Sequence, residues 1–463
     1  MQLPNQLKTA ALIQKLHWVA DPVGYMKQAN KQYPDIFTGS IVGFGDTVVF
    51  VSHPQGIQEI LSNDRKQFTA PGSFNRIGEP IVGSSCIAML DSSLHKKRRQ
   101  LLMPAFHGER MRAYGQIICN LAEQVFDNLP VEQPFSACVA MQEISLQVTL
   151  QTIFGLYEGE RYQKIKYLLA SLLDLFSSPL SSSLLMFPLL QKDLGAWSTW
   201  GRFLKLRQQI DELLYAEINE RRQRFDPNRI DVLSLLMSAK DEEGQAMTNQ
   251  ELRDELILMM FSAKETSAMS MAWVLYWTHY KPEVLEKLLE ELANLGESPD
   301  PMNIYRLPYL TAVCNESLRI HPVLMLTLPR VVQEPLKLMG YPLETGTVVA
   351  GCIYLTHHRK DLYPEPDQFK PERFLDRQFS IYEFLPFGGG SRRCIGEALA
   401  LFEMKLVVAK VLSNYQLALA SREPEQLHRR GFGVGPTNGI QMLIRRPRNP
   451  HRSLVSTGIT SAS

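Results

Sequence analysis

The chain has 463 residues, 45% of which are hydrophobic, so it is long enough to bury a large core. Its 49 lysines and arginines nearly balance its 48 aspartates and glutamates, which argues against a nucleic acid as partner because such binding needs a basic face. No linker-like stretch interrupts residues 1–445, which predicts a single domain. Residues 446–463, rich in arginine, serine and threonine, are expected to form a disordered tail.

Cysteine usage and hydropathy narrow the class of protein. The six cysteines include no Cys-x-x-Cys pair, which leaves a zinc ribbon or a thioredoxin-type site unsupported and is typical of the reducing cytoplasm. The N-terminal residues lack the pattern of a signal peptide, and no run reaches the roughly 18 apolar residues of a transmembrane helix. The most apolar stretch, 168–190, predicts a helix, a loop and a helix in the core, with a substrate entrance or a membrane-touching loop as the alternative.

In chain order, the first predicted element is a hairpin over residues 36–52 that turns at Gly43–Asp46. A later strand is predicted over 347–355. Between them, apolar residues at helical spacing predict helices over 110–128, 139–155, 160–176 and 200–223. The predicted fold class is therefore mainly α with a small β region (α+β), with β structure near 36–70 and 325–360 and helices over 90–320 and 395–415.

The longest predicted helix covers residues 248–280. Thr248 and Glu251 fit a capping box, and Pro282 stops the helix. About 32 residues at roughly 1.5 Å each span about 48 Å, so this helix must cross the whole globule. It is apolar on nearly every face, which indicates that it is buried.

A polar stretch, Ser262–Ser267, interrupts this apolar helix. One interpretation is a kink at the surface, where serine and threonine hydroxyls bond to carbonyls one turn back. The other is a groove of small residues beside a cofactor, in which Thr266 offers a hydroxyl and Glu265 connects to a supply of protons. The stretch alone favours the kink.

A second unusual segment runs from Phe387 to Gly396 and contains three glycines before Cys394. Glycines allow a tight backbone and the close approach of a flat ligand. Because a helical run follows at once, exposed amides are expected to favour the thiolate of Cys394, and Arg392 and Arg393 add positive charge. An inert buried thiol is the usual interpretation of a lone cysteine, but the flanking glycines and arginines argue against it.

This segment resembles the haem-binding loop of the cytochrome P-450 superfamily. The pattern Phe387-x-x-Gly390-x-Arg392-x-Cys394-x-Gly396 matches that loop at every fixed position. The pattern is long and chemically mixed, so chance is a poor explanation.

Other segments resemble the same family, in the family's order. Residues 95–99 resemble the start of its propionate-binding helix, and 262–266 its oxygen-activation stretch. Residues 316–319 resemble its Glu-x-x-Arg motif, and 371–374 the segment that supplies a second arginine. The resemblance covers the chain from about residue 30 to 445 and implies the cytochrome P-450 fold.

The resemblance implies a haem b (iron protoporphyrin IX) between the long helix and the cysteine loop, with dioxygen as co-substrate. Cys394 is implied as the axial ligand of the haem iron, and Thr266 and Glu265 as the catalytic hydroxyl and proton donor. The residues implied to contact the haem or its propionates are His95, Arg99, Arg330, Arg392, Phe387, Gly388, Ala263 and Gly396. Glu316, Arg319 and Arg373 are implied to form a buried salt-bridged cluster under the loop.

The chain departs from the family pattern at Ser262-Ala263-Lys264. The family usually has alanine or glycine and then glycine at the first two positions. The methyl group of Ala263 is therefore expected to narrow the groove in which oxygen binds. Lys264 is also unusual at its position.

The implied activity is that of a haem-thiolate monooxygenase, which uses two external electrons to hydroxylate or epoxidise a hydrophobic small molecule such as a fatty acid, alkane or terpene. The expected electron donor is a ferredoxin with its reductase, which Lys96, Lys97 and Arg393 could meet. A monomer without a transmembrane anchor is expected. The alternatives are an electron-independent haem-thiolate enzyme of the peroxygenase or isomerase type and a non-catalytic haem-binding sensor.

Overall fold

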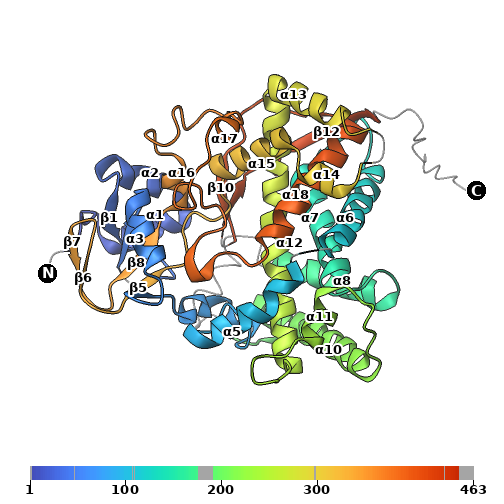
Figure 1. The fold of residues 1–463 in the computed structure, drawn as a ribbon, viewed down its shortest axis with the longest axis horizontal. Coiled ribbons are helices and arrows are strands. Elements are labelled where there is room, and N and C mark those ends of the chain that lie inside the picture. The colour runs from blue at the N-terminus through green and yellow to red at the C-terminus, as the bar shows by residue number, and fades with distance from the viewer. Residues whose placement is uncertain are drawn as a thin grey trace, which may run out of the picture.

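The structure is a computed structural model that describes residues 3–45, 47–106, 108, 110–175, 191–296, 299–431 and 433–447. Its central element is the helix α12 (Asn249–Tyr280), which runs through the whole molecule (Figure 1). The predicted capping box is confirmed, because the Thr248 hydroxyl accepts from the Glu251 amide and the Glu251 carboxylate accepts from the Thr248 amide. The helix is continuous through residues 262–267.

Helices surround α12, which explains its apolar faces. α7 (Ala137–Thr152), α18 (Glu397–Asn414) and α10 (Thr199–Gln223) all pack against it, and α6 (Arg110–Asp127) packs on α7 and α18. Apolar side chains from these helices form one large buried core. The other described helices of this part are α4 (Glu79–Val82), α5 (Ser92–Leu102), α8 (Glu160–Leu175), α11 (Val232–Ser238), α13 (Pro282–Ala293), α14 (Pro301–Tyr305), α15 (Pro308–Ile320) and α17 (Arg373–Asp376).

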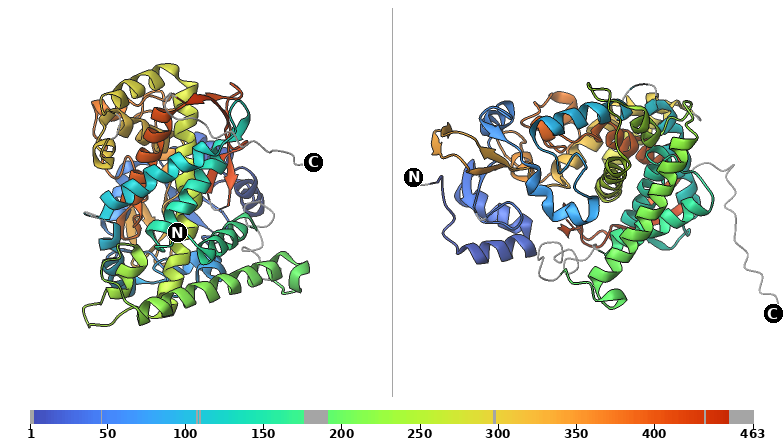
Figure 2. Two further views of the ribbon diagram at one scale, coloured as in Figure 1. Left: turned by 90° about the vertical axis from the view of Figure 1, so that its right-hand side faces the viewer. Right: turned by 90° about the horizontal axis from the view of Figure 1, so that it is seen from below.

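A small β region lies to one side of the helices (Figures 1 and 2). Its main sheet has the order β1-β2-β8-β5-β3. These strands are β1 (Ile36–Gly39), β2 (Val48–Val51), β3 (Phe68–Thr69), β5 (Arg330–Val332) and β8 (Val348–Gly351), and α1 (Ala11–Ala20), α2 (Pro22–Gln32), α3 (Pro54–Ser62) and α16 (Ile353–His357) belong to the same part of the chain. The antiparallel pairing of Ile36 with Val51 confirms the predicted hairpin.

Three smaller sheets are also present among the described residues. β4 (Pro134–Ser136), β12 (Gln441–Pro447) and β9 (Tyr415–Leu419) form one of them, β6 (Leu336–Leu338) pairs with β7 (Tyr341–Leu343), and β10 (Leu427–Arg430) pairs with β11 (Gly433–Pro436). Within the described ranges, no helix has both the length and the apolar character that crossing a bilayer requires.

Two predicted boundaries are wrong. The strand predicted over 347–355 ends at Gly351, because its parallel partner β2 ends at Val51 and residues 353–357 then close a helical turn as α16. Arg446 and Pro447, predicted to belong to a disordered tail, pair with β9 in the last strand, and residues 448–463 lie outside the described residues. Of the helix, loop and helix predicted over 168–190, residues 168–175 belong to α8, and residues 176–190 lie outside the described residues.

Candidate active site

The cysteine loop, residues 387–396, presents Cys394 to open space just before α18. Cys394 is the exposed member of the six cysteines, whereas the other five are buried. The amide of Cys394 donates to the carbonyl of Phe387 at 3.0 Å and closes the loop. Gly388 and Gly390 have φ angles of 68° and 65°, which side chains rarely adopt. The glycine-rich sequence is therefore needed for the loop conformation.

Opposing influences act on the Cys394 thiol. The surrounding protein displaces much of the water that would stabilise a thiolate, which raises the pKa of Cys394 above its ordinary value. A hydrogen bond from the amide of Gly396 and the charges of Arg99 and Arg393 lower the pKa in part. Arg393 also pairs with Glu397, at 2.6 Å, so its charge is shared.

Arg392 points away from the thiol, contrary to the expectation that its charge would favour the thiolate. Its guanidinium donates to the carbonyls of Ala70, Ile87 and Leu90 at 2.6–3.2 Å. Burial, with the nearby charge of Arg330, lowers the pKa of Arg392 to about 10. A nearly buried cation held mainly by neutral carbonyls is well suited to an added carboxylate.

Arg330 is fully buried on β5 and reaches the cysteine loop. It donates to the carbonyl of Gly389 and to the carboxylate of Asp64, both at 3.0 Å. Its Nε is buried and finds no hydrogen-bond partner among the described residues. Buried polar atoms are normally satisfied, so this free donor marks a place for a missing acceptor.

His95 and Arg99 lie one turn apart on α5. Burial and the charges of Arg392, Arg99 and Arg65 lower the pKa of His95 to about 3. With no carboxylate bonded to it among the described residues, His95 is therefore neutral near pH 7, and a neutral imidazole can still donate to a propionate through a ring N–H. Arg99 donates to the carbonyl of Arg393 at 2.7 Å.

These observations test whether the site fits a haem. The group needs a thiolate-forming side chain with access to it and cations for two carboxylates. The structure places the exposed Cys394 in a loop that contains Arg392 and contacts Arg99 and Arg330, with a surplus of buried positive charge. The donor set fits.

The polar stretch of α12 carries the other predicted residues. The Thr266 hydroxyl donates to the carbonyl of Ser262 at 2.5 Å, so the hydrogen bond to the preceding turn is present in this structure. Glu265 accepts from the amide nitrogen of Gln142 on α7 at 2.7 Å. Ala263 is half-buried, whereas Lys264 is buried and lies 3.7 Å from Asp174 on α8. Lys264 therefore faces α8, away from the exposed side of Ser262.

Glu316, Arg319 and Arg373 meet in one buried cluster. Arg319 holds the Glu316 carboxylate with two bonds, of 2.7 and 2.9 Å, and Arg373 adds a third of 3.1 Å. Arg319 also donates to the carbonyl of His357 at 2.8 Å, and the His357 ring accepts from the amide of Leu385 at 3.0 Å. The cluster thus connects, through His357, to the segment that leads into the cysteine loop.

Sequence reasoning missed Glu403, a buried carboxyl group on α18. The Ser145 hydroxyl on α7 donates to it at 2.6 Å, and Ser267, next to Thr266, also bonds to it. Burial raises the pKa of Glu403 to about 7, and the two serines lower it in part. Its position between the apolar residues Phe402 and Met404 was the signal that could have identified it.

Glu403 predicts a pH dependence of stability. Its folded-state pKa lies above the unfolded value, so its contribution to stability is complete below about pH 4.5 and is lost as the pH rises toward 7. Replacement by glutamine keeps an acceptor for Ser145 but removes this titration. Denaturant unfolding should show that Glu403→Gln gains roughly 2 kcal/mol relative to the native chain between about pH 5.5 and 7.5. A constant difference across that range would show that Glu403 is ionised in the folded protein.

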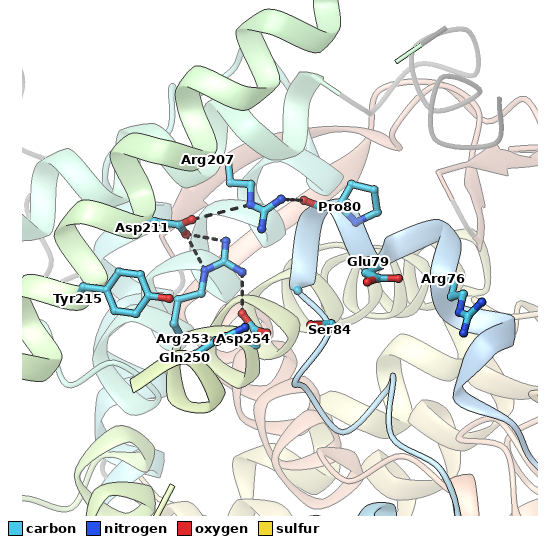
Figure 3. A pocket seen from close by; sticks show the side chains of 11 residues that line it. Arg76, Glu79, Pro80, Ser84, Arg207, Asp211, Tyr215, Gln250, Arg253 and Asp254 are labelled. Atoms are coloured by element: carbon cyan, nitrogen blue, oxygen red, sulfur yellow. Dashed lines mark hydrogen bonds and ion pairs between the residues drawn. The ribbon is translucent and has the colours of Figure 1, made fainter. Parts of the chain in front are cut away.

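A separate polar pocket of about 390 Å³ lies between α4, α10 and the first turns of α12 (Figure 3). In it, Arg253 lies 2.5 Å from Asp211 and 2.9 Å from Asp254, and Asp254 also accepts from the amide of Ser85. These charges largely neutralise one another. The described residues that line the pocket include none from the cysteine loop or from 262–266, so the pocket lies outside the candidate active site. The hydrogen bond from Ser85 to Asp254 connects the segment after α4 to α12.

Comparison with known proteins places the chain in a family. The model of the cytochrome P450 family matches residues 4–443. The chain is 30% identical over 452 residues to cytochrome P450 135B1 of Mycobacterium tuberculosis, which covers 97% of this chain and 93% of that protein. It is 31% identical over 427 residues to cytochrome P450 137 of the same organism, with 90% and 84% coverage. The chain belongs to the cytochrome P450 family, which implies a haem-containing oxidoreductase that uses dioxygen.

Solved structures confirm the fold. The retinoic-acid-bound cyanobacterial CYP120A1 is similar with a TM-score of 0.83 at 20% identity, and the match covers 96% of this chain and 99% of that one. The haem domain of cytochrome P450DA gives a TM-score of 0.81 at 20% identity, with 96% and 98% coverage. The predicted fold class, mainly α with small sheets, is therefore correct.

Proposed function

We propose that this protein is a monooxygenase that binds haem b through Cys394 and inserts one oxygen atom of dioxygen into a hydrophobic small molecule. The observation that carries the proposal is the one exposed thiol of the chain, held in a loop bordered by buried arginines. A non-catalytic haem sensor would need the same loop. The residue pair Glu265 and Thr266 on α12 favours catalysis over sensing.

The chain's own residues would hold and orient the group. Cys394 would bind the iron, and the propionates would be bound by Arg99, Arg330, Arg392 and the neutral His95. The amide of Gly396 would temper the basicity of the thiolate, and Phe387, Gly388 and Ala263 would border the ring. When bound, the haem supplies the electron-transfer and oxygen chemistry that no side chain can provide.

Protons would pass along α12. Gln142 holds one carboxylate oxygen of Glu265, which fixes that side chain and leaves the second oxygen to take and release a proton. The Thr266 hydroxyl would leave the carbonyl of Ser262 to donate toward the oxygen-binding side. Glu403, whose pKa is close to 7, lies behind this stretch through Ser267 as a reserve of protons.

Replacing Thr266 by alanine tests this assignment. We expect Thr266→Ala to bind haem normally but to form about tenfold less product per electron pair, because one hydrogen bond of roughly 1.4 kcal/mol is lost where oxygen is activated. The missing electrons should appear as hydrogen peroxide. Product, peroxide and consumed reductant are measured together.

Thr278→Ala is the matched control, since Thr278 makes the same type of bond to the preceding turn, at 2.9 Å, further along α12. This variant should keep the native product yield. An unchanged yield in Thr266→Ala would remove Thr266 from the mechanism. Turnover with peroxide that ignores a reductase would instead favour a peroxygenase.

A groove of about 490 Å³ supports a separate electron donor as partner. Arg65, Lys96, Arg99, Met103 and Pro104 line it together with Gln100 and with Ser391 of the cysteine loop, so it combines positive charge with an apolar floor. An acidic ferredoxin suits this surface. Lys97 and Arg393, also predicted for this role, are instead paired with Glu243 and Glu397.

The substrate class rests on the sequence. The segments 70–92 and 168–198 are rich in apolar residues, which suits a fatty acid, alkane or terpene. A screen for ligands that shift the spin state of the haem spectrum would identify it. The monomeric state and the cytoplasmic location stay predictions.

A further inference from the structure

A buried carboxylate lies directly against the cysteine loop. Asp64 follows α3 in a tight turn in which the next residue, Arg65, has a φ of 73°. That left-handed conformation is unusual for a residue with a side chain and is often retained where it serves a function. The Asp64 side chain is only 4% exposed.

One carboxylate oxygen of Asp64 makes hydrogen bonds that connect it to the cysteine loop. Oδ2 accepts from the amide of Ser391 at 2.8 Å and from Arg330 at 3.0 Å, and Arg330 in turn bonds the carbonyl of Gly389. The fit at Gly390 is tight, since a Cβ atom there would lie 2.6 Å from the same oxygen. Asp64 and Arg330 thus clamp three consecutive residues that end three positions before Cys394.

The other oxygen of Asp64 is unusual. Oδ1 is buried and has no hydrogen-bond partner among the described residues, and the same holds for Nε of Arg330. Leaving a buried polar atom unpaired costs free energy, so such atoms are rare in folded proteins. Asp64 is also a carboxylate in a cluster that is otherwise rich in the positive charges of Arg65, Arg99 and Arg392.

We propose that Asp64 is the positioning residue of the cysteine loop: it fixes the loop through the Ser391 amide and, as a fixed negative charge against that loop, it lowers the reduction potential of the iron. The inference rests on the proposed haem binding through Cys394. Reduction adds negative charge to the site, and a buried anion opposes this because the surrounding dielectric is low. The loop contact and the charge are separable by mutation.

Asp64→Asn keeps an oxygen that can accept from Ser391 but removes the charge. This variant should keep the red-shifted absorption of the carbon-monoxide-bound ferrous form, which reports the thiolate ligand. At a fixed solution potential its ratio of ferrous to ferric protein should rise about tenfold, which corresponds to about 59 mV for one electron. Spectroscopic redox titration measures this ratio. A ratio equal to that of the native protein would overturn the electrostatic role.

Asp64→Ala removes both the acceptor and the charge. The red-shifted band should then be largely lost, and hydrogen exchange of the amides of 389–394 should be at least tenfold faster, while amides of α12 exchange as before. An Ala variant that keeps the band and the native exchange would overturn the positioning role. Exchange needs no bound haem, so it remains informative if the variant loses the group.

Asp91→Asn is the control for charge alone. Asp91 lies 3.9 Å from Arg392 but is 62% exposed, so water and salt screen its charge and its removal should change the ratio less than threefold. A native protein without the red-shifted band would contradict the proposed function itself. That result is distinct from a native band combined with unchanged Asp64 variants.

Discussion

Replacement of Cys394 by serine is expected to abolish the red-shifted absorption of the carbon-monoxide-bound ferrous protein and to remove monooxygenase activity. A serine hydroxyl does not replace the thiolate as an electron-rich ligand, and the other five thiols are buried. The loop itself should stay folded, because its closing bond uses the backbone amide of residue 394. Difference spectra of the reduced protein with and without carbon monoxide give the measurement.

Cys138→Ser is the matched control for this prediction. Cys138 is a buried thiol at the start of α7, and its replacement should leave the absorption band in place. Survival of the band in Cys394→Ser would show that another residue binds the iron. Loss of the band in both variants would point to a general loss of fold.

The second large effect is expected for Glu316→Ala. Glu316 is fully buried between Arg319 and Arg373, and its removal leaves at least one guanidinium buried without a counter-charge. Breaking a buried pair by removing one partner costs about 3–5 kcal/mol. That is a large share of the roughly 5–15 kcal/mol that stabilises a typical domain. Urea unfolding followed by circular dichroism should therefore show a much lower midpoint.

Two further variants make the result specific. Glu316→Gln keeps the shape and some of the hydrogen bonds but removes the charge, and it should fall between alanine and the native chain. Glu243→Ala removes the exposed partner of Lys97 and should hardly change the midpoint. An unfolding midpoint of Glu316→Ala equal to that of Glu243→Ala would contradict a stabilising role of the cluster.

The long helix and the main motifs could be predicted from the sequence because their signals are local. The capping pair Thr248 and Glu251, together with Pro282, defines the helix without knowledge of its neighbours. The segment from Phe387 to Cys394 likewise contains the glycines that its conformation needs. The structure shows that two of them, Gly388 and Gly390, have positive φ angles.

The remaining features depend on contacts between distant segments. Val348–Gly351 is a strand only as far as β2 offers a partner, although the apolar pattern continues. The direction of the Arg392 guanidinium depends on carbonyls more than 300 positions away in the chain. Asp64 looks like an ordinary acidic residue until the fold buries it against the cysteine loop.

The neutral state of His95 illustrates why charges are hard to assign from a sequence. A histidine at the start of a basic helix suggests a cation for a carboxylate. With no described carboxylate bonded to it, burial and the charges of Arg392, Arg99 and Arg65 keep it neutral near pH 7. Arg99 is one turn away on the same helix, but only the fold brings Arg65 and Arg392 to it.

The absorption spectrum of the purified native protein, reduced and exposed to carbon monoxide, tests the central claim most directly. Binding of haem through Cys394 predicts about one haem per chain and the red-shifted band of a thiolate-bound iron. A band at the position typical of a histidine-bound haem, or a folded protein that takes up no haem, would contradict it.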